Sequence, residues 1–262
     1  MKNLQELIEN LKSQERVDAA FLTGSFGALE ANKFSDIDLV VISGKNAENI
    51  KSVYEKIDGI FADIFFFDKT DLERLLDMKE LDGNSTDGIL LSWIAKADIK
   101  FDKSGLVGKI KNRASEIRLF VSDIEKRNVL QQISYNHIQN RRHFDSGENK
   151  YREALKIRLM YSVVELITGF LALRGESWRG EKSAINFIKV TDSYFYQLFL
   201  DFDKKADIEN KMKIYEEMVK RVLPQGISLY SYDGPICLSK DKNTEEEIDK
   251  LRIFWEEISG GK

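Results

Sequence analysis

The spacing of apolar residues changes abruptly near residue 108, and this change limits the folds that the chain can adopt. Before it, short β-branched and aromatic runs alternate with helical patterns. Such alternation is typical of a sheet with flanking helices. The runs predict strands at 17–23, 36–42, 59–67 and 97–105, and the segment 47–57 predicts a helix.

Beyond residue 108 the pattern is helical almost throughout. The only two prolines of the chain are Pro224 and Pro235, so few positions interrupt long helices. Helical patterns occupy roughly 108–145, 151–174, 181–200, 207–222 and 244–258. We therefore predict an α+β chain in which residues 1–107 form a mixed sheet with flanking helices and residues 108–262 form an α-helical bundle.

The composition and the apolar stretches indicate which kinds of partner and which compartment the protein has. A formal net charge of -4 disfavours a nucleic acid held along its phosphates. The single cysteine, Cys237, cannot form an internal disulfide and suits a reducing compartment. Residues 1–17 lack the apolar core of a signal peptide, and the most apolar later stretch, 159–175, is too short to span a bilayer. We expect a soluble, cytoplasmic protein with no membrane partner.

Two aspartates stand two residues apart at the start of the predicted strand 36–42. Side chains alternate along a strand, so Asp36 and Asp38 share one face, with their Cα atoms about 6–7 Å apart. Two like charges on one face repel each other, and a divalent cation removes that repulsion. Hard oxygen ligands without a nearby His or Cys favour Mg²⁺ over zinc. A helix cap or an exposed strand pair is the plain structural alternative.

A second polar element, "TGS", stands where one predicted strand ends and a short helical piece begins. Gly24 permits a sharp turn, and Ser25 with the amides of the turn can hold a phosphate. Asp63 is the only acidic residue inside the apolar run 59–67. Strand interiors disfavour Asp, and burial of its ionised side chain costs free energy, so a functional role would explain its presence. It is the candidate third carboxylate of a site with two Mg²⁺ ions. Together these residues predict a site for a metal-bound triphosphate.

"GS", a gap of ten residues, "DID" and an acidic residue on a later strand resemble the DNA polymerase β-like nucleotidyltransferase superfamily. The resemblance covers roughly residues 15–105, and the strand and turn in "KADIKFDKSG" are also typical of that superfamily. In length and in its helical second half, the chain is similar to the antibiotic nucleotidyltransferases, which modify aminoglycosides or lincosamides.

The resemblance implies a specific reaction: transfer of AMP from ATP, or of another nucleoside monophosphate, onto a hydroxyl of a small acceptor, with release of pyrophosphate. Asp36 and Asp38 would coordinate Mg²⁺ that bridges the nucleotide phosphates. Asp63 would join them at the second metal ion. Ser25, next to Gly24, would hydrogen-bond the leaving phosphates.

In the second half, a polar-to-small stripe crosses an otherwise apolar helix. Arg158, Ser162, Glu165 and Gly169 recur at steps of four, three and four. The stripe either faces a substrate cleft, with Glu165 as general base for the acceptor hydroxyl, or forms a solvated edge or a close helix contact at Gly169. Lys182 is the candidate to bind the β- and γ-phosphates, since several relatives place a lysine near this point. An ordinary polar loop is the alternative.

Two other functions fit part of the pattern. One is a nucleotidyltransferase whose acceptor is a protein or an RNA end, as in toxin–antitoxin pairs, although the absence of a basic run disfavours RNA. The other is a non-catalytic nucleotide-binding module, which the intact carboxylate set disfavours. The apolar residues of the last helical pattern either pack on the bundle or form a homodimer interface.

Overall fold

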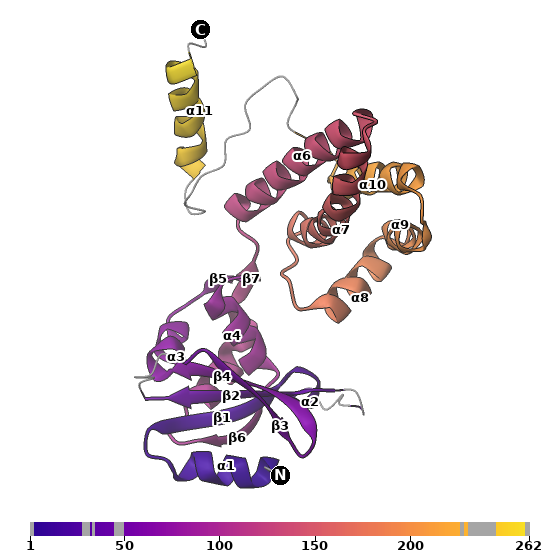
Figure 1. Cartoon of the computed structure of the whole chain (residues 1–262). Coiled ribbons are helices and arrows are strands. Elements are labelled where there is room, and N and C mark those ends of the chain that lie inside the picture. The colour runs from indigo at the N-terminus through magenta and orange to yellow at the C-terminus, as the bar shows by residue number, and fades with distance from the viewer. Residues whose placement is uncertain are drawn as a thin grey trace. The chain divides into compact units, whose positions relative to one another are not determined.

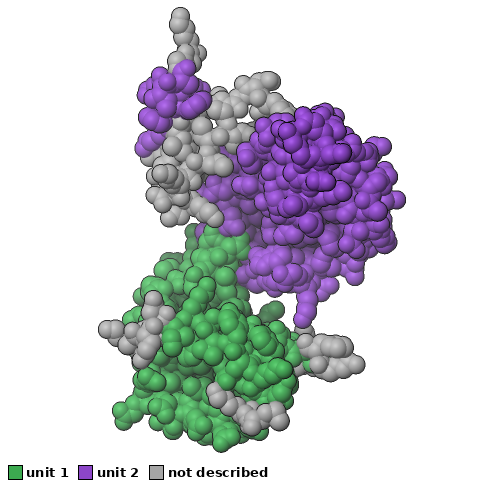
Figure 2. All heavy atoms as spheres, in the orientation of Figure 1, with its two compact units in different colours: residues 1–119 green, residues 120–262 purple. Residues whose placement is uncertain are grey.

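The chain separates into two compact units, residues 1–119 and residues 120–262 (Figure 2). The computed structural model describes residues 3–27, 32, 35–44, 50–225, 228–229 and 245–259, so that Cys237 and Pro235 lie outside the described residues. The division between 119 and 120 falls later than the predicted boundary between 107 and 108. The reason is α5 (Leu106–Arg113), which buries Leu106, Val107 and Ile110 in the core of the first unit.

The first unit is built on a five-stranded mixed sheet with the strand order β3-β4-β2-β1-β6. Its β2 and β4 are parallel, whereas the other neighbouring pairs are antiparallel. A mixed sheet followed by a helical region confirms the predicted fold class. The five strands are β1 (Val17–Thr23), β2 (Ile37–Ser43), β3 (Ser52–Ile57), β4 (Ile60–Asp68) and β6 (Asp98–Asp102).

Alternation along the strands gives the sheet two apolar faces, each with its own core. One face packs on α1 (Leu4–Ser13), where Ile8 joins buried residues such as Leu39. The other face, which carries Phe21 and Val40, packs on α3 (Lys69–Leu76), α4 (Thr86–Ala95) and α5. Figure 1 shows α3 and α4 on the opposite side of the sheet from α1. Complete burial of a Leu, Ile or Phe side chain contributes about 1.5–3 kcal/mol, so these two layers position the strands firmly.

The predicted helix at 47–57 is wrong, because residues 52–57 form β3. Asp58 (φ 53°) and Gly59 (φ 79°) both adopt left-handed backbone conformations between the paired residues Ile57 and Ile60. An Asp-Gly pair in this conformation makes the two-residue turn whose twist suits a β-hairpin. Pairing with β4 therefore outweighs the weak helical spacing of the segment. Residues 45–49 lie outside the described part.

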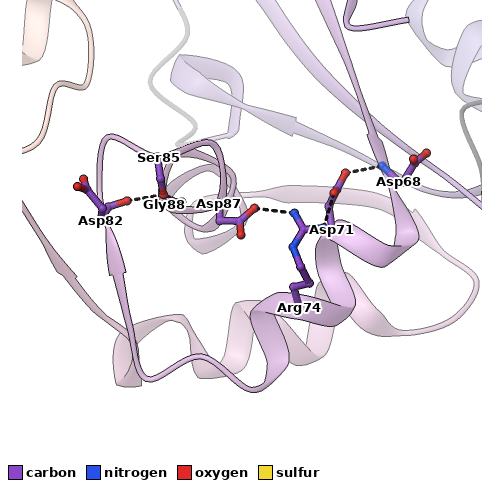
Figure 3. A network of polar contacts seen from close by, with 7 residues as sticks. All are labelled: Asp68, Asp71, Arg74, Asp82, Ser85, Asp87 and Gly88. Atoms are coloured by element: carbon purple, nitrogen blue, oxygen red, sulfur yellow. Dashed lines mark hydrogen bonds and ion pairs between the residues drawn. The ribbon is translucent and has the colours of Figure 1, made fainter. Parts of the chain in front are cut away.

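Polar contacts hold α3 and α4 over their face of the sheet (Figure 3). The Asp68 N–H at the end of β4 donates to Asp71 Oδ2 at 2.8 Å. The Arg74 guanidinium then joins Asp71 of its own helix, at 3.0 Å, to Asp87 of α4, also at 3.0 Å. These contacts connect the end of β4 to α3 and α4. A short two-stranded sheet of β5 (Glu80–Asp82) and β7 (Arg118–Phe120) completes the unit.

The second unit is helical, and the buried side chains of its core include Phe170, Phe195 and Met218. Phe170 stacks on Phe195, with ring centroids 4.7 Å apart. The predicted single helix at 181–200 divides at Asp192, whose Oδ1 accepts from the Phe195 N–H at 3.0 Å and so caps a new helix. The helices are α6 (Asp123–Asp145), α7 (Asn149–Ala172), α8 (Glu181–Thr191), α9 (Ser193–Lys204), α10 (Ile208–Val222) and α11 (Glu245–Ser259).

Two further properties of the helices bear on partners. Within the described residues, no helix is both long and apolar enough to cross a bilayer. On α11 the apolar side chains Ile253, Phe254, Trp255 and Ile258 are exposed, so the described part of this helix does not bury the apolar face that the sequence gives it.

Candidate active site

Strand pairing places one residue from each of four strands in a row across the sheet. Thr23 of β1 pairs with Asp38 of β2, and Asp38 pairs in turn with Asp63 of β4. On the far side of β4, Asp63 pairs with Tyr54 of β3. Residues directly beside one another in paired strands point to the same face of the sheet. The side chains of Thr23, Asp38, Asp63 and Tyr54 therefore share one face.

This row lies at the edge of the face that α3, α4 and α5 cover. Two residues further along β2 and β4, at Val40 and Phe65, the same face is part of the apolar core with those helices. Thr23 is buried, and its hydroxyl donates to the Trp93 carbonyl of α4 at 3.4 Å. The carboxylates of Asp38 and Asp63 thus lie next to the end of the apolar core that α3, α4 and α5 cover.

The turn at Gly24 lies directly against the Asp38 carboxylate. β1 ends at Thr23, and the four-residue α2 (Gly24–Gly27) begins with Gly24 at φ +60°. A Cβ atom built on Gly24 would lie 2.1 Å from Asp38 Oδ2, closer than any real contact. Glycine suits this position, because it tolerates the backbone conformation and leaves room for the carboxylate, which any Cβ atom would displace. The "GS" and "DID" elements are therefore neighbours in space, and Ser25 follows half-buried.

Asp63 carries unfavourable electrostatics that a cation would relieve. Burial raises the pKa of the Asp63 carboxyl, and the charge of Asp36 raises that pKa further. Asp63 Oδ1 is buried without a hydrogen-bond partner among the described residues. A buried carboxylate oxygen without a donor, close to a second carboxylate, is a costly arrangement in a folded protein. Oxygen donors of this kind fit a hard divalent cation such as Mg²⁺.

The three carboxylates are not arranged as a complete metal-binding site in this structure. In the described part of the chain, no three His, Cys, Asp or Glu side chains are grouped so that they could hold a metal ion as they stand. Asp38 and Asp63 lie on neighbouring strands, which run about 4.8 Å apart, and Asp36 precedes Asp38 by two residues, about 6–7 Å along the chain. The three carboxylates are therefore near neighbours, but in this conformation they are not grouped around a common point.

In the second unit, the predicted stripe on α7 packs against α6. Arg158 donates to Asn136 Oδ1 at 2.9 Å and to Asn140 Oδ1 at 2.8 Å, and Asn140 donates to Ser162 Oγ at 3.0 Å. The Asn136 amide also donates to Glu165 Oε2. The stripe is thus a polar helix–helix contact, one of the two interpretations that the sequence left open.

Glu165 within this contact is half-buried. Burial raises the pKa of its carboxyl, against the opposing effects of the Asn136 hydrogen bond and the Arg158 charge. Its role as a general base stays a prediction. Its partner Asn136 and the neighbouring Asn140 were not predicted from the sequence. Their spacing of four on α6 was the available signal, since asparagine is a poor residue for a helix interior.

Lys182 lies in the first turn of α8 and is exposed. The preceding Trp178 is partly buried against the core of the second unit, and so acts as an anchor for the segment before α8. Burial lowers the pKa of the neighbouring Arg179. Contact between Lys182 and a triphosphate stays a prediction, because Lys182 and the aspartates belong to different units.

Comparison with known proteins identifies the first unit. A family model described as "Polymerase beta, Nucleotidyltransferase" matches residues 5–93, about a third of the chain, and this range includes Gly24, Asp36, Asp38 and Asp63. Residues 5–93 are thus a polymerase β-like nucleotidyltransferase domain, which confirms the superfamily that the motif predicted.

The other comparisons add less. Among solved structures, the chain is similar to a nucleotidyltransferase-like protein from Exiguobacterium sibiricum 255-15, with 11% sequence identity and a TM-score of 0.42. That similarity covers 83% of this chain and 72% of the other. A search of curated proteins finds no match.

Proposed function

We propose that this chain is a cytoplasmic, Mg²⁺-dependent nucleotidyltransferase that transfers AMP from ATP to a hydroxyl of a small molecule. The observation that carries the proposal is the pairing of Asp38 with Asp63 on neighbouring parallel strands, with the Gly24 turn against Asp38. The domain match supports nucleotidyl transfer as the class of reaction. Aminoglycosides and lincosamides are the first acceptors to test, because the length of the chain and its helical second unit are similar to those of antibiotic nucleotidyltransferases.

The residues of the first unit divide between two tasks. Gly24 lets the triphosphate approach the backbone, and the Ser25 hydroxyl donates to the phosphates that leave as pyrophosphate. Asp36, Asp38 and Asp63 would hold one or two Mg²⁺ ions, for which the orphaned oxygen of Asp63 is a fitting ligand. Bound magnesium neutralises phosphate charge and acidifies a hydroxyl that lies against it.

The reaction forms one bond and breaks one. The acceptor oxygen bonds to the α-phosphorus, the bond from that phosphorus to the bridging oxygen breaks, and the electron pair leaves with pyrophosphate. The proton of the hydroxyl must pass to a base, for which Glu165 is the candidate, because burial raises its pKa and so its basicity. Lys182 is the candidate cation for the β- and γ-phosphates.

Calorimetric titration with Mg·ATP tests the proposal, using the wild type, Asp38→Asn and the control Asp77→Asn. Asp77 is an exposed residue after α3, so the control makes the same chemical change away from the row. We expect the wild type and the control to bind alike, and Asp38→Asn to bind at least tenfold more weakly. Equal affinity in all three proteins would reject the assignment. Pyrophosphate release with a panel of aminoglycosides and lincosamides then identifies the acceptor class.

A further inference from the structure

Two aromatic side chains stand uncovered on the same face as the carboxylates. Tyr54 of β3 is 59% exposed and Phe61 of β4 is 52% exposed. Their rings stack with centroids 6.4 Å apart and planes 14° from parallel, so the two exposed rings adjoin each other in nearly parallel orientation. The Ser52 hydroxyl donates to the Tyr54 hydroxyl at 3.1 Å, which helps to hold that ring in place. We name Tyr54 and Phe61 the aromatic platform.

Other aromatic residues on this face are covered, and the contrast marks the platform as unusual. Phe65 lies four residues after Phe61 on β4, and Phe67 lies two residues after Phe65. All three side chains therefore point to the same face of the sheet. The rings of Phe65 and Phe67 pack on Trp93 of α4, with centroids 4.9 Å and 6.2 Å away. The cover by α4 stops before Asp63, and beyond it the aromatic surface is open. Exposed aromatic area beside a candidate site is more informative than isolated surface apolar residues.

The platform adjoins the carboxylates in register. Tyr54 pairs directly with Asp63 across β3 and β4. Phe61 precedes Asp63 by two residues on β4, so its side chain points to the same face as the Asp63 carboxylate. Asp63 therefore has the Tyr54 side chain as its neighbour across the strands and the Phe61 side chain as its neighbour along β4, within about 5–8 Å between Cα or Cβ atoms.

The geometry of in-line attack indicates which substrate would contact the aromatic platform. This step rests on the proposed function. The Gly24 turn lies at the β1 end of the row, whereas Tyr54 lies at the β3 end. If the leaving phosphates sit at Gly24 and Ser25, in-line displacement requires the attacking hydroxyl to approach the α-phosphorus from the opposite side. That side is the one with Asp63, Tyr54 and Phe61.

We propose that the aromatic platform of Tyr54 and Phe61 binds the acceptor, and that the acceptor presents a sugar ring to it. The electron-rich faces of the two rings attract the slightly positive C–H face of a sugar. Amino groups on such a ring would gain further from the aromatic faces and from Asp36. An anionic acceptor would be repelled by the neighbouring carboxylates. A hydroxyl on the same sugar ring would then lie next to Asp63, where attack is required.

Saturation-transfer NMR tests the platform with kanamycin A and lincomycin as sugar-bearing probes. The test compares the wild type with Tyr54→Ala/Phe61→Ala, with the conservative Tyr54→Phe and with Val53→Ala. Val53 adjoins Tyr54 on the same strand but points to the opposite face, and it is also exposed, at 38%. We expect saturation of sugar C–H protons in the wild type, Tyr54→Phe and Val53→Ala, and about a tenfold weaker affinity in the double variant. Mg·ATP affinity should stay within twofold in all four proteins.

Three results would overturn the inference. The first is no saturation transfer to either probe with the wild type. The second is a double variant that loses Mg·ATP affinity and keeps the sugar, which would assign the platform to the nucleobase. The third is a wild-type dimer that dissociates in the double variant during sedimentation, which would make β3, an edge strand of its sheet, a self-interface. Failure of the proposed function is distinguishable, because the wild type would then bind no Mg·ATP while sugar contact still depended on Tyr54 and Phe61.

Discussion

The contact between Gly24 and Asp38 makes a quantitative prediction for Gly24→Ala. The new methyl group would lie 2.1 Å from Asp38 Oδ2, whereas an ordinary contact needs about 3.4 Å. The carboxylate must therefore move by about 1.3 Å, the difference between these two distances. In addition, alanine at φ +60° carries a left-handed backbone strain of about 1–2 kcal/mol.

Gly59→Ala separates these two effects. Gly59 has a similarly left-handed φ of +79°, but a Cβ built there meets nothing within 4 Å. It lies in the same unit, in the turn between β3 and β4. Backbone strain should therefore cost each variant about 1–2 kcal/mol of unfolding free energy, and only Gly24→Ala should in addition disturb the carboxylate row.

The assay is Mg²⁺-dependent ATP binding by calorimetry, with thermal unfolding measured by circular dichroism. Displacing a group that orients a metal ligand typically weakens metal affinity by about 10–100-fold, so we expect this loss for Gly24→Ala relative to Gly59→Ala. Equal binding by the two variants, at comparable stability, would refute the argument that Gly24 exists to admit the Asp38 carboxylate.

Three further predictions concern other parts of the chain. Asp63→Asn should raise stability at pH 7 in Mg²⁺-free buffer, because the folded-state pKa of Asp63 is raised by burial and by Asp36, and stability is lost as pH rises through that pKa. Added Mg²⁺ should then stabilise the wild type but not this variant in thermal unfolding. Burial lowers the pKa of His137, so the unfolded state takes up a proton more readily, and wild-type stability should fall below about pH 6.5 more steeply than that of His137→Gln. Gly169→Ala should lower stability by about 1–3 kcal/mol, because its Cβ would lie 2.7 Å from Ile133 Cδ1, and Ile133→Val should restore part of the loss in urea unfolding.

Each of these predictions has a contradicting result. A Mg²⁺-free Asp63→Asn protein less stable than the wild type would show that the carboxylate makes a stabilising contact. Parallel pH curves for the wild type and His137→Gln would mean that this imidazole titrates normally in the folded state. Additive effects of Gly169→Ala and Ile133→Val would show that the two residues do not share a contact, since coupled neighbours deviate from additivity.

The structure decides one choice that the sequence left open and corrects one prediction. Arg158, Ser162 and Glu165 bond to asparagines of α6, so the stripe on α7 is a packing surface in the second unit. The hairpin of β3 and β4 replaces the predicted helix at 47–57, and with it places Tyr54 beside Asp63. In the first case the partner lies 22 to 29 residues away along the chain, where a local pattern carries no information about it. In the second case the Asp58–Gly59 pair was a local hairpin signal, and the weak helical spacing before it concealed that signal.

Most local elements, and the kinds of chemistry they carry, could be predicted from the sequence. Strand-like runs around Asp38 and Asp63, the turn at Gly24 and the long helices of the second unit follow from the spacing and type of neighbouring residues. The polymerase β-like motif is likewise a local spacing of a few residue types, so a reader of the sequence alone can recognise it.

The register of the strands, in contrast, is a property of the folded chain. A shift of one residue between β2 and β4 would turn Asp63 to the face that packs on α1, and no local pattern distinguishes the two alignments. Burial of both faces selects one of them, and that choice places Asp63 beside Asp38 and leaves Tyr54 and Phe61 uncovered next to the carboxylates. The candidate site therefore depends on strand pairing and long-range packing as much as on the identity of its residues.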